Sequence, residues 1–166
     1  MEQPNSSDFL QQWLMNYLKR YAATTGQLRQ ACYRYLRRKN LEPAHYEVEL
    51  NRLIQDAISR NWLNDQLLAE KRLEQWRLAG KSRQYIKEKL QHQGINNTEI
   101  GLLLEEEEED SEISAARRFV NRKKLGNLLL NPENGTRKFL QKLAMAGFSA
   151  AVSYNLLDEY KTLNEL

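Results

Sequence analysis

The sequence predicts an all-α protein in which three tandem three-helix repeats stack into an elongated, curved solenoid. Glycine occurs seven times and proline three times among 166 residues, whereas Leu, Glu, Lys, Arg and Gln, which favour helices, are abundant. Apolar residues recur at intervals of three and four, which is the spacing of the buried face of a helix. A set of apolar and helix-ending residues also recurs along the chain, as in a repeat protein. We therefore expect nine helices and no strands.

The first expected repeat begins with an amphipathic helix. Its apolar residues are Phe9, Leu10, Trp13, Leu14, Tyr17, Leu18 and Tyr21. Thr24 and Gln27 have the Thr-x-x-Gln spacing of a capping box, so a second helix is expected to start there. Pro43 prevents that helix from continuing, and a third helix follows with Val48, Leu50, Leu53, Ile54 and Ile58.

The second and third repeats are expected to follow the same order. Asn64 or Asp65 can cap a helix that stops near Gly80, and Ser82 can cap the next one, which stops at Gly94. A third cycle of helices begins near residue 111 and is interrupted by turn-forming residues at 131–135.

Matched residues support this periodicity. Ile86, Leu90, Gly94 and Ile95 match Phe139, Leu143, Gly147 and Phe148 at an offset of 53, and Cys32, Leu36, Asn40 and Leu41 match the first set at an offset of 54. The second helix of each repeat thus ends in Gly or Asn, the residues that best adopt a left-handed conformation. The expected organisation is a flexible N-terminus at 1–8 and repeats at 9–63, 64–108 and 109–166.

Charge is distributed unevenly, although the net charge is only +3. Between Phe9 and Leu41 there are seven basic residues and no acidic ones, whereas seven of the eight residues from Glu105 to Glu112 are acidic. A basic face favours an anionic partner. We interpret the acidic run as a solvated helix end or linker; contact with a basic patch on a partner stays open.

The sequence offers no set of residues typical of catalysis or metal binding. Cys32 is the single cysteine, and two distant histidines, His45 and His92, cannot complete a zinc site with it. Gly80-Lys81-Ser82 resembles the end of a phosphate-binding loop, but Gln75 stands where that motif needs Gly. We expect a non-enzymatic protein with no cofactor, metal or small-molecule substrate. The N-terminus lacks a signal-peptide pattern and no long apolar run is present, so we expect a cytoplasmic protein with no membrane partner.

Two basic clusters are the candidate contact residues for a partner or DNA. They contain Arg34, Arg37 and Arg38 in the first repeat, and Arg117, Arg118, Lys123 and Lys124 in the third. Basic residues neutralise phosphates, and neighbouring aromatic residues such as Tyr33 and Tyr35 can stack on bases. Both kinds of residue also occur simply as helix surface and core, and the sequence leaves these alternatives open.

Three stretches of the sequence resemble the RecX family. They are the junction Trp62-Leu63-Asn64-Asp65-Gln66-Leu67-Leu68-Ala69, the run Gly80, Ile86, Leu90, Gly94 and Ile95, and the signature Leu143, Gly147, Phe148 and Ser149. The resemblance covers about residues 9–160. The matched positions Asp65, Ala69, Gly80, Gly94, Gly147 and Phe148 are expected to be structural. Asn61 replaces a usual Gly, and Met145 and Ala146 replace usual basic residues, which weakens the expectation of a basic contact near Gly147.

The resemblance implies a regulatory protein that binds the RecA recombinase filament on single-stranded DNA. It implies modulation, most often inhibition, of the filament's ATPase, strand-exchange and coprotease activities in recombination, DNA repair and the SOS response. The residues themselves also suggest an alternative, a basic helical-repeat protein that binds single- or double-stranded DNA directly.

Overall fold

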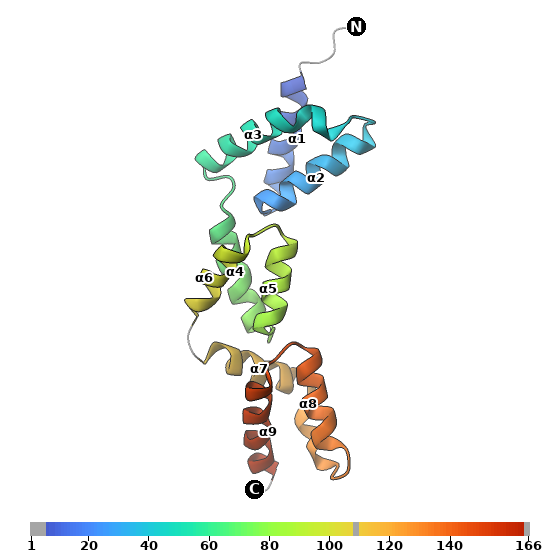
Figure 1. The fold of residues 1–166 in the computed structure, drawn as a ribbon, viewed down its shortest axis with the longest axis vertical. Coiled ribbons are helices and arrows are strands. Elements are labelled where there is room, and N and C mark those ends of the chain that lie inside the picture. The colour runs from blue at the N-terminus through green and yellow to red at the C-terminus, as the bar shows by residue number, and fades with distance from the viewer. Residues whose placement is uncertain (1–5, 108–109, 165–166) are drawn as a thin grey trace. The chain divides into compact units, whose positions relative to one another are not determined.

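The computed structural model describes residues 6–107 and 110–164, where all regular secondary structure is helical (Figure 1). The elements are α1 (Ser6–Arg20), α2 (Thr25–Arg38), the 3-10 helix η1 (Pro43–Tyr46), α3 (Glu47–Ser59), α4 (Asp65–Leu78), α5 (Arg83–His92), α6 (Asn97–Glu105), α7 (Ser111–Lys123), the 3-10 helix η2 (Leu125–Leu130), α8 (Gly135–Met145) and α9 (Ala150–Asn164). The all-α class is confirmed. Most of the expected flexible terminus, residues 1–5, lies outside the described residues, as do residues 108–109.

The helices form two compact units rather than one body. Unit 1 consists of Met1–Ala69 with His92–Asn96, and unit 2 of Glu70–Gln91 with Asn97–Leu166. The division falls within α4 and at the end of α5, so each unit combines parts of the expected repeats. The boundaries of the three repeats, and their stacking, stay a prediction. None of the helices described has the length and apolar character needed to cross a membrane.

Unit 1 is held together by an aliphatic core from its first three helices and the segment after them. The buried residues are Leu10, Leu14, Leu28, Cys32, Leu36, Leu50, Leu53, Ile54, Ala57 and Leu63. Burial raises the pKa of the Cys32 thiol to about 11. A thiol is a poor nucleophile when it is protonated, so the structure agrees with a small buried hydrophobe at this position.

Unit 2 has its own core between α7, η2, α8 and α9. The buried residues are Ala115, Ala116, Val120, Leu125, Phe139, Leu143, Phe148, Leu156 and Leu157. The 3-10 helix η2 lies so close to the start of α8 that a Cβ atom on Gly135 would be 2.1 Å from the carbonyl oxygen of Leu128. Glycine is therefore required there, because backbone cannot move aside as a flexible side chain can.

The expected helix ends have left-handed backbone. Asn40 has a φ of 56°, and Gly94 and Gly147 have φ values of 83° and 86°. Asn61 also has a φ of 56°, which explains why a Gly-to-Asn exchange is tolerated there, because Asn adopts this conformation more easily than most residues. These four residues end helices and turn the chain towards the next element.

Candidate functional site

A buried hydroxyl at the start of α2 forms the first of two helix junctions. Thr24 is fully buried, and its hydroxyl oxygen accepts a hydrogen bond of 3.1 Å from the backbone N–H of Gln27. This completes the predicted capping box, in which the Gln27 side chain accepts from the Thr24 backbone N–H. The same hydroxyl donates to the carbonyl oxygen of Gln93, directly before Gly94. One side chain therefore caps α2 and ties it to the end of α5.

A carboxylate completes this first junction. Asp65 accepts hydrogen bonds from the backbone N–H and the hydroxyl of Thr25, at 2.8 and 3.2 Å. Asn64, not Asp65, caps α4, because its side-chain oxygen accepts from the Leu67 N–H at 2.9 Å. Asp65 instead serves the start of α2, where free N–H groups and the helix dipole favour a negative charge.

The second junction repeats both contacts in unit 2. The Ser82 hydroxyl accepts from the Tyr85 N–H at 3.2 Å and donates to the Ala146 carbonyl at 2.7 Å, directly before Gly147. The backbone N–H of Arg83 donates to the Glu112 carboxylate, 3.0 and 3.1 Å from its two oxygens. Ser82, which was expected to cap α5, thus also joins the start of α5 to the end of α8, and Glu112 joins the start of α5 to α7.

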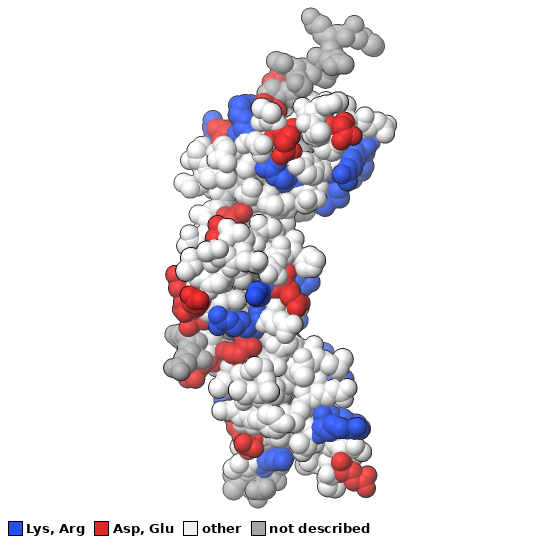
Figure 2. Space-filling model, in the orientation of Figure 1, with Lys and Arg blue, Asp and Glu red and all other residues white. Residues whose placement is uncertain are grey.

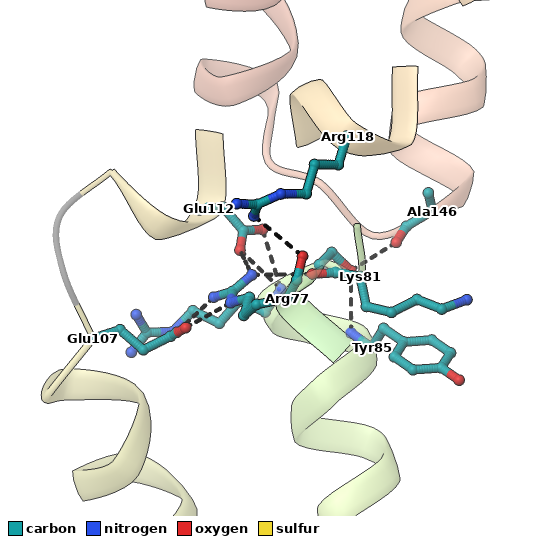
Figure 3. A network of polar contacts seen from close by, with 9 residues as sticks. Arg77, Lys81, Tyr85, Glu107, Glu112, Arg118 and Ala146 are labelled. Carbon is teal, nitrogen blue, oxygen red and sulfur yellow. Dashed lines mark hydrogen bonds and ion pairs between the residues drawn. The ribbon is translucent and has the colours of Figure 1, made fainter. Parts of the chain in front are cut away.

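A buried arginine distinguishes the second junction from the first (Figure 3). Arg77 is 7% exposed, and it donates to both oxygens of Glu107, at 2.6 and 2.5 Å. It also donates to Glu112 and, at 3.1 Å, to the carbonyl of Lys81. Burial alone would lower the pKa of Arg77, but the hydrogen bonds to Glu107 and Glu112 outweigh it and raise the pKa. The charge of Arg77 is therefore fully compensated within the chain.

Glu107 corrects our interpretation of the acidic run as a solvated linker. Its side chain is only 9% exposed and it forms an ion pair with Arg77, so at least this glutamate is part of the folded structure. Arg77 was not among the residues singled out from the sequence. Helical periodicity gave no reason to bury it, and its partners lie 30 and 35 residues away.

The first basic cluster lies on α2 and is free of such partners. Arg34, Arg37 and Arg38 are exposed, and none forms an ion pair or a hydrogen bond between side chains within the described part of the chain. Figure 2 shows basic side chains gathered over α2 in unit 1. Their charges are available to a partner without the loss of an internal contact.

The second basic cluster, in unit 2, is partly committed to internal contacts. Arg117 donates two hydrogen bonds of 2.9 Å to Glu159, which raise the pKa of Arg117 and lower that of Glu159. Arg118 donates to the backbone carbonyl of Arg77 at 3.4 Å. Lys123 and Lys124 are exposed. The two clusters belong to different units, and the α2 cluster is the stronger candidate contact surface.

The tyrosines of the first repeat have structural roles. Tyr33 donates to Glu47 at 2.6 Å, and Tyr35 stacks on Trp13 with ring centroids 5.1 Å apart. Trp13 stacks in turn on Tyr17 at 5.3 Å, and Tyr17 lies 5.0 Å from Tyr21. The four rings of Tyr35, Trp13, Tyr17 and Tyr21 form an aromatic row that ends in Tyr21, which is 56% exposed.

Comparison with known proteins identifies relatives of this chain. No family model matches it. The regulatory protein RecX of Myxococcus xanthus (strain DK1622) is 29% identical over 161 residues, which cover 92% of this chain and 86% of the relative. The chain is thus a relative of RecX. The predicted resemblance to the RecX family is confirmed.

Solved RecX structures share the fold. RecX from Lactobacillus salivarius superposes with a TM-score of 0.76 at 19% identity, covering 94% of this chain and 97% of that one. A second RecX crystal structure gives a TM-score of 0.72 at 17% identity, covering 92% of this chain and 71% of that one. The all-helical fold described above is therefore shared with these two RecX structures.

Proposed function

We propose that this chain is a non-enzymatic regulator of the RecX type that binds the filament of a RecA recombinase in the cytoplasm and inhibits its activities. The observation that carries this proposal is the likeness to RecX over nearly the whole chain, in sequence and in fold. The activities concerned are the ATPase, strand exchange and coprotease functions of the filament on single-stranded DNA.

The α2 cluster supports this proposal physically. Its three exposed arginines form no ion pair among the described residues. They could therefore bind a partner without first breaking an existing ion pair. Arginine is also the basic residue best suited to planar carboxylate and phosphate groups, which it binds with two parallel hydrogen bonds. The proposed stacking of repeats at 9–63, 64–108 and 109–166 would add the extended surface that repeat proteins use for long partners.

The test of this function is a titration of a RecA recombinase with the purified chain, with single-stranded DNA-dependent ATPase rate as the readout. We expect inhibition at concentrations near or below that of the recombinase. An unchanged rate, with the recombinase filament verified by electron microscopy and the chain verified as folded by circular dichroism, would contradict the proposal.

A second candidate function is direct binding of single-stranded DNA. The aromatic row of Tyr35, Trp13, Tyr17 and Tyr21 lies on the helices that carry the acid-free basic segment. Its exposed end, Tyr21, offers a ring on which a base can stack beside cations. This function predicts binding of a labelled oligonucleotide without recombinase and a steep loss of affinity with salt. Replacing Tyr21 by Ala should weaken that binding about tenfold, since stacking contributes about 1–3 kcal/mol per base.

A further inference from the structure

A groove on unit 1 lies between the second half of α1 and the segment that follows α3. It is lined by Met15, Leu18, Lys19 and Trp62 and has a volume of about 350 Å³, within the range of roughly 300–1,000 Å³ that is common for ligand pockets. Trp62 is 46% exposed, and the Arg60 guanidinium covers its ring at 5.3 Å from the centroid. Three of the four lining residues are apolar and the fourth carries a positive charge.

Unit 2 has a groove at the corresponding place in its order of helices. It lies between α4 and the segment leading into α7, and it is lined by Glu70, Leu73, Glu74, Arg77, Leu103, Glu106, Glu107 and Ser111. Arg77 stands five residues before the capping Ser82, as Lys19 stands five residues before the capping Thr24. In unit 2 the chain supplies its own acidic segment, and Glu107 of that segment binds Arg77.

Among the described residues, no acidic side chain lines the unit 1 groove. Trp62 occupies the position before α4 that the acidic segment occupies before α7, and Lys19 is exposed. Among residues 6–107 and 110–164, the Lys19 ammonium forms no ion pair. From Phe9 to Leu41 the chain also contains no carboxylate. The positive charge beside the apolar surface therefore has no ion-pair partner within the described part of the chain.

We propose that the unit 1 groove is a docking site for an acidic segment of a partner protein that carries one or two bulky apolar residues. The apolar residues pack on Met15, Leu18 and Trp62, and a neighbouring carboxylate binds Lys19. The unit 2 groove supplies the precedent, because there a stretch of leucines and glutamates from the chain itself provides both parts. This inference does not rest on the proposed function, since it concerns the chemistry of the site and not the identity of the partner.

The test is fluorescence anisotropy with a labelled peptide that copies residues 103–111, LLEEEEEDS, and the full chain. We expect saturable binding, weakened at least tenfold by Lys19→Glu and by Trp62→Ala. Lys142→Glu is the matched control, because it makes the same change of charge on the exposed surface of α8, outside both the groove and the α2 cluster, and should weaken binding less than twofold. Circular dichroism of each variant verifies that the fold is retained.

Two further peptides separate this site from general attraction between charges. We expect SSEEEEEDS, without the leucines, and LLQQQQQNS, without the carboxylates, each to bind at least tenfold more weakly. Equal weakening by Lys19→Glu and Lys142→Glu, or equal binding of the leucine-free peptide, would overturn the proposal. Absence of peptide binding, while the chain still inhibits the recombinase ATPase, would overturn the docking site and leave the proposed function in place.

Discussion

The two helix junctions use the same contacts but differ in charge. In both, a hydroxyl caps a helix and donates to the carbonyl before a left-handed glycine, while a carboxylate accepts from the next backbone N–H. The second junction adds Arg77, buried between Glu107 and Glu112, where the first has the exposed Lys19. The comparison teaches that Arg77 at the second junction holds folded segments together, whereas Lys19 and the three arginines of the α2 cluster form no ion pair within the described part of the chain.

The largest expected effect is on Arg77. Replacing it by Met leaves two carboxylates close together without their cation, which destabilises a protein by about 3 kcal/mol or more for a buried pair. Lys19→Met is the matched change at the first junction and should alter the free energy of unfolding by less than about 0.5 kcal/mol, because Lys19 is exposed. Urea unfolding measures unit 2 by the fluorescence of Trp76 with Trp13 and Trp62 replaced by Phe, and unit 1 by the fluorescence of Trp13 and Trp62 with Trp76 replaced by Phe. Equal effects of the two changes would contradict the contrast between the junctions.

The two junction glycines should differ in the same experiment. A Cβ atom on Gly94 would lie 2.8 Å from the backbone of Gly26, whereas a Cβ atom on Gly147 would meet the Ser82 hydroxyl at 2.7 Å and the Gln84 side chain at 3.2 Å. Side chains can move where backbone cannot, although both sites also have the strain of a left-handed Ala. We expect Gly94→Ala to destabilise by about 2–3 kcal/mol and Gly147→Ala by about 1–2 kcal/mol. A greater loss of unfolding free energy for Gly147→Ala than for Gly94→Ala would contradict the expectation that a Cβ atom is tolerated less well against the backbone of Gly26.

The capping hydroxyls of Thr24 and Ser82 should contribute a little less to the free energy of unfolding than the two junction glycines. Thr24→Val and Ser82→Ala each remove a cap and leave a carbonyl without its donor, so each should lower the free energy of unfolding by about 1–2 kcal/mol. Thr24→Ser keeps the hydroxyl and is the control, with an expected loss below about 1 kcal/mol. Amide exchange at the first turns of α2 and α5 measures each junction separately. Unchanged exchange in both hydroxyl-free variants would show that the caps are dispensable.

The smallest expected effect is on the loss of stability at acidic pH, through the Arg117–Glu159 pair. Hydrogen bonds from Arg117 lower the pKa of Glu159 below its ordinary value of 4.5. Because the folded pKa lies below the unfolded one, the pair stabilises the fold above about pH 4.5, and this contribution is lost as the pH falls through the folded pKa. Both side chains are partly exposed, so the contribution should be below about 1 kcal/mol. Glu159→Gln should therefore narrow the difference in urea midpoint between about pH 6 and pH 3.5; an unchanged difference would assign the acid sensitivity to other groups.

The helices were predictable from the sequence because their signals are local. Apolar spacing, the Thr24–Gln27 capping box and the glycines near helix ends each act within a few residues. Contacts between distant segments were not predictable in this way. Asp65 could be recognised as a cap, but its partner Thr25 lies 40 residues away. The difference between the two basic clusters could not be predicted either. In the sequence Arg34 and Arg117 look alike, and only the structure places Glu159 beside Arg117.

The most direct test of the proposed function compares charge reversals in the recombinase ATPase titration. Arg34→Glu with Arg38→Glu removes the positive charge from one face of α2, and Lys138→Glu with Lys142→Glu makes the same change at the same helical spacing on the exposed surface of α8. We predict that the α2 pair raises the concentration needed for half-maximal inhibition at least tenfold and that the α8 pair changes it less than threefold. Inhibition that survives the α2 reversal unchanged, in a variant with native circular dichroism, would contradict the assignment of α2 as the surface that contacts the filament.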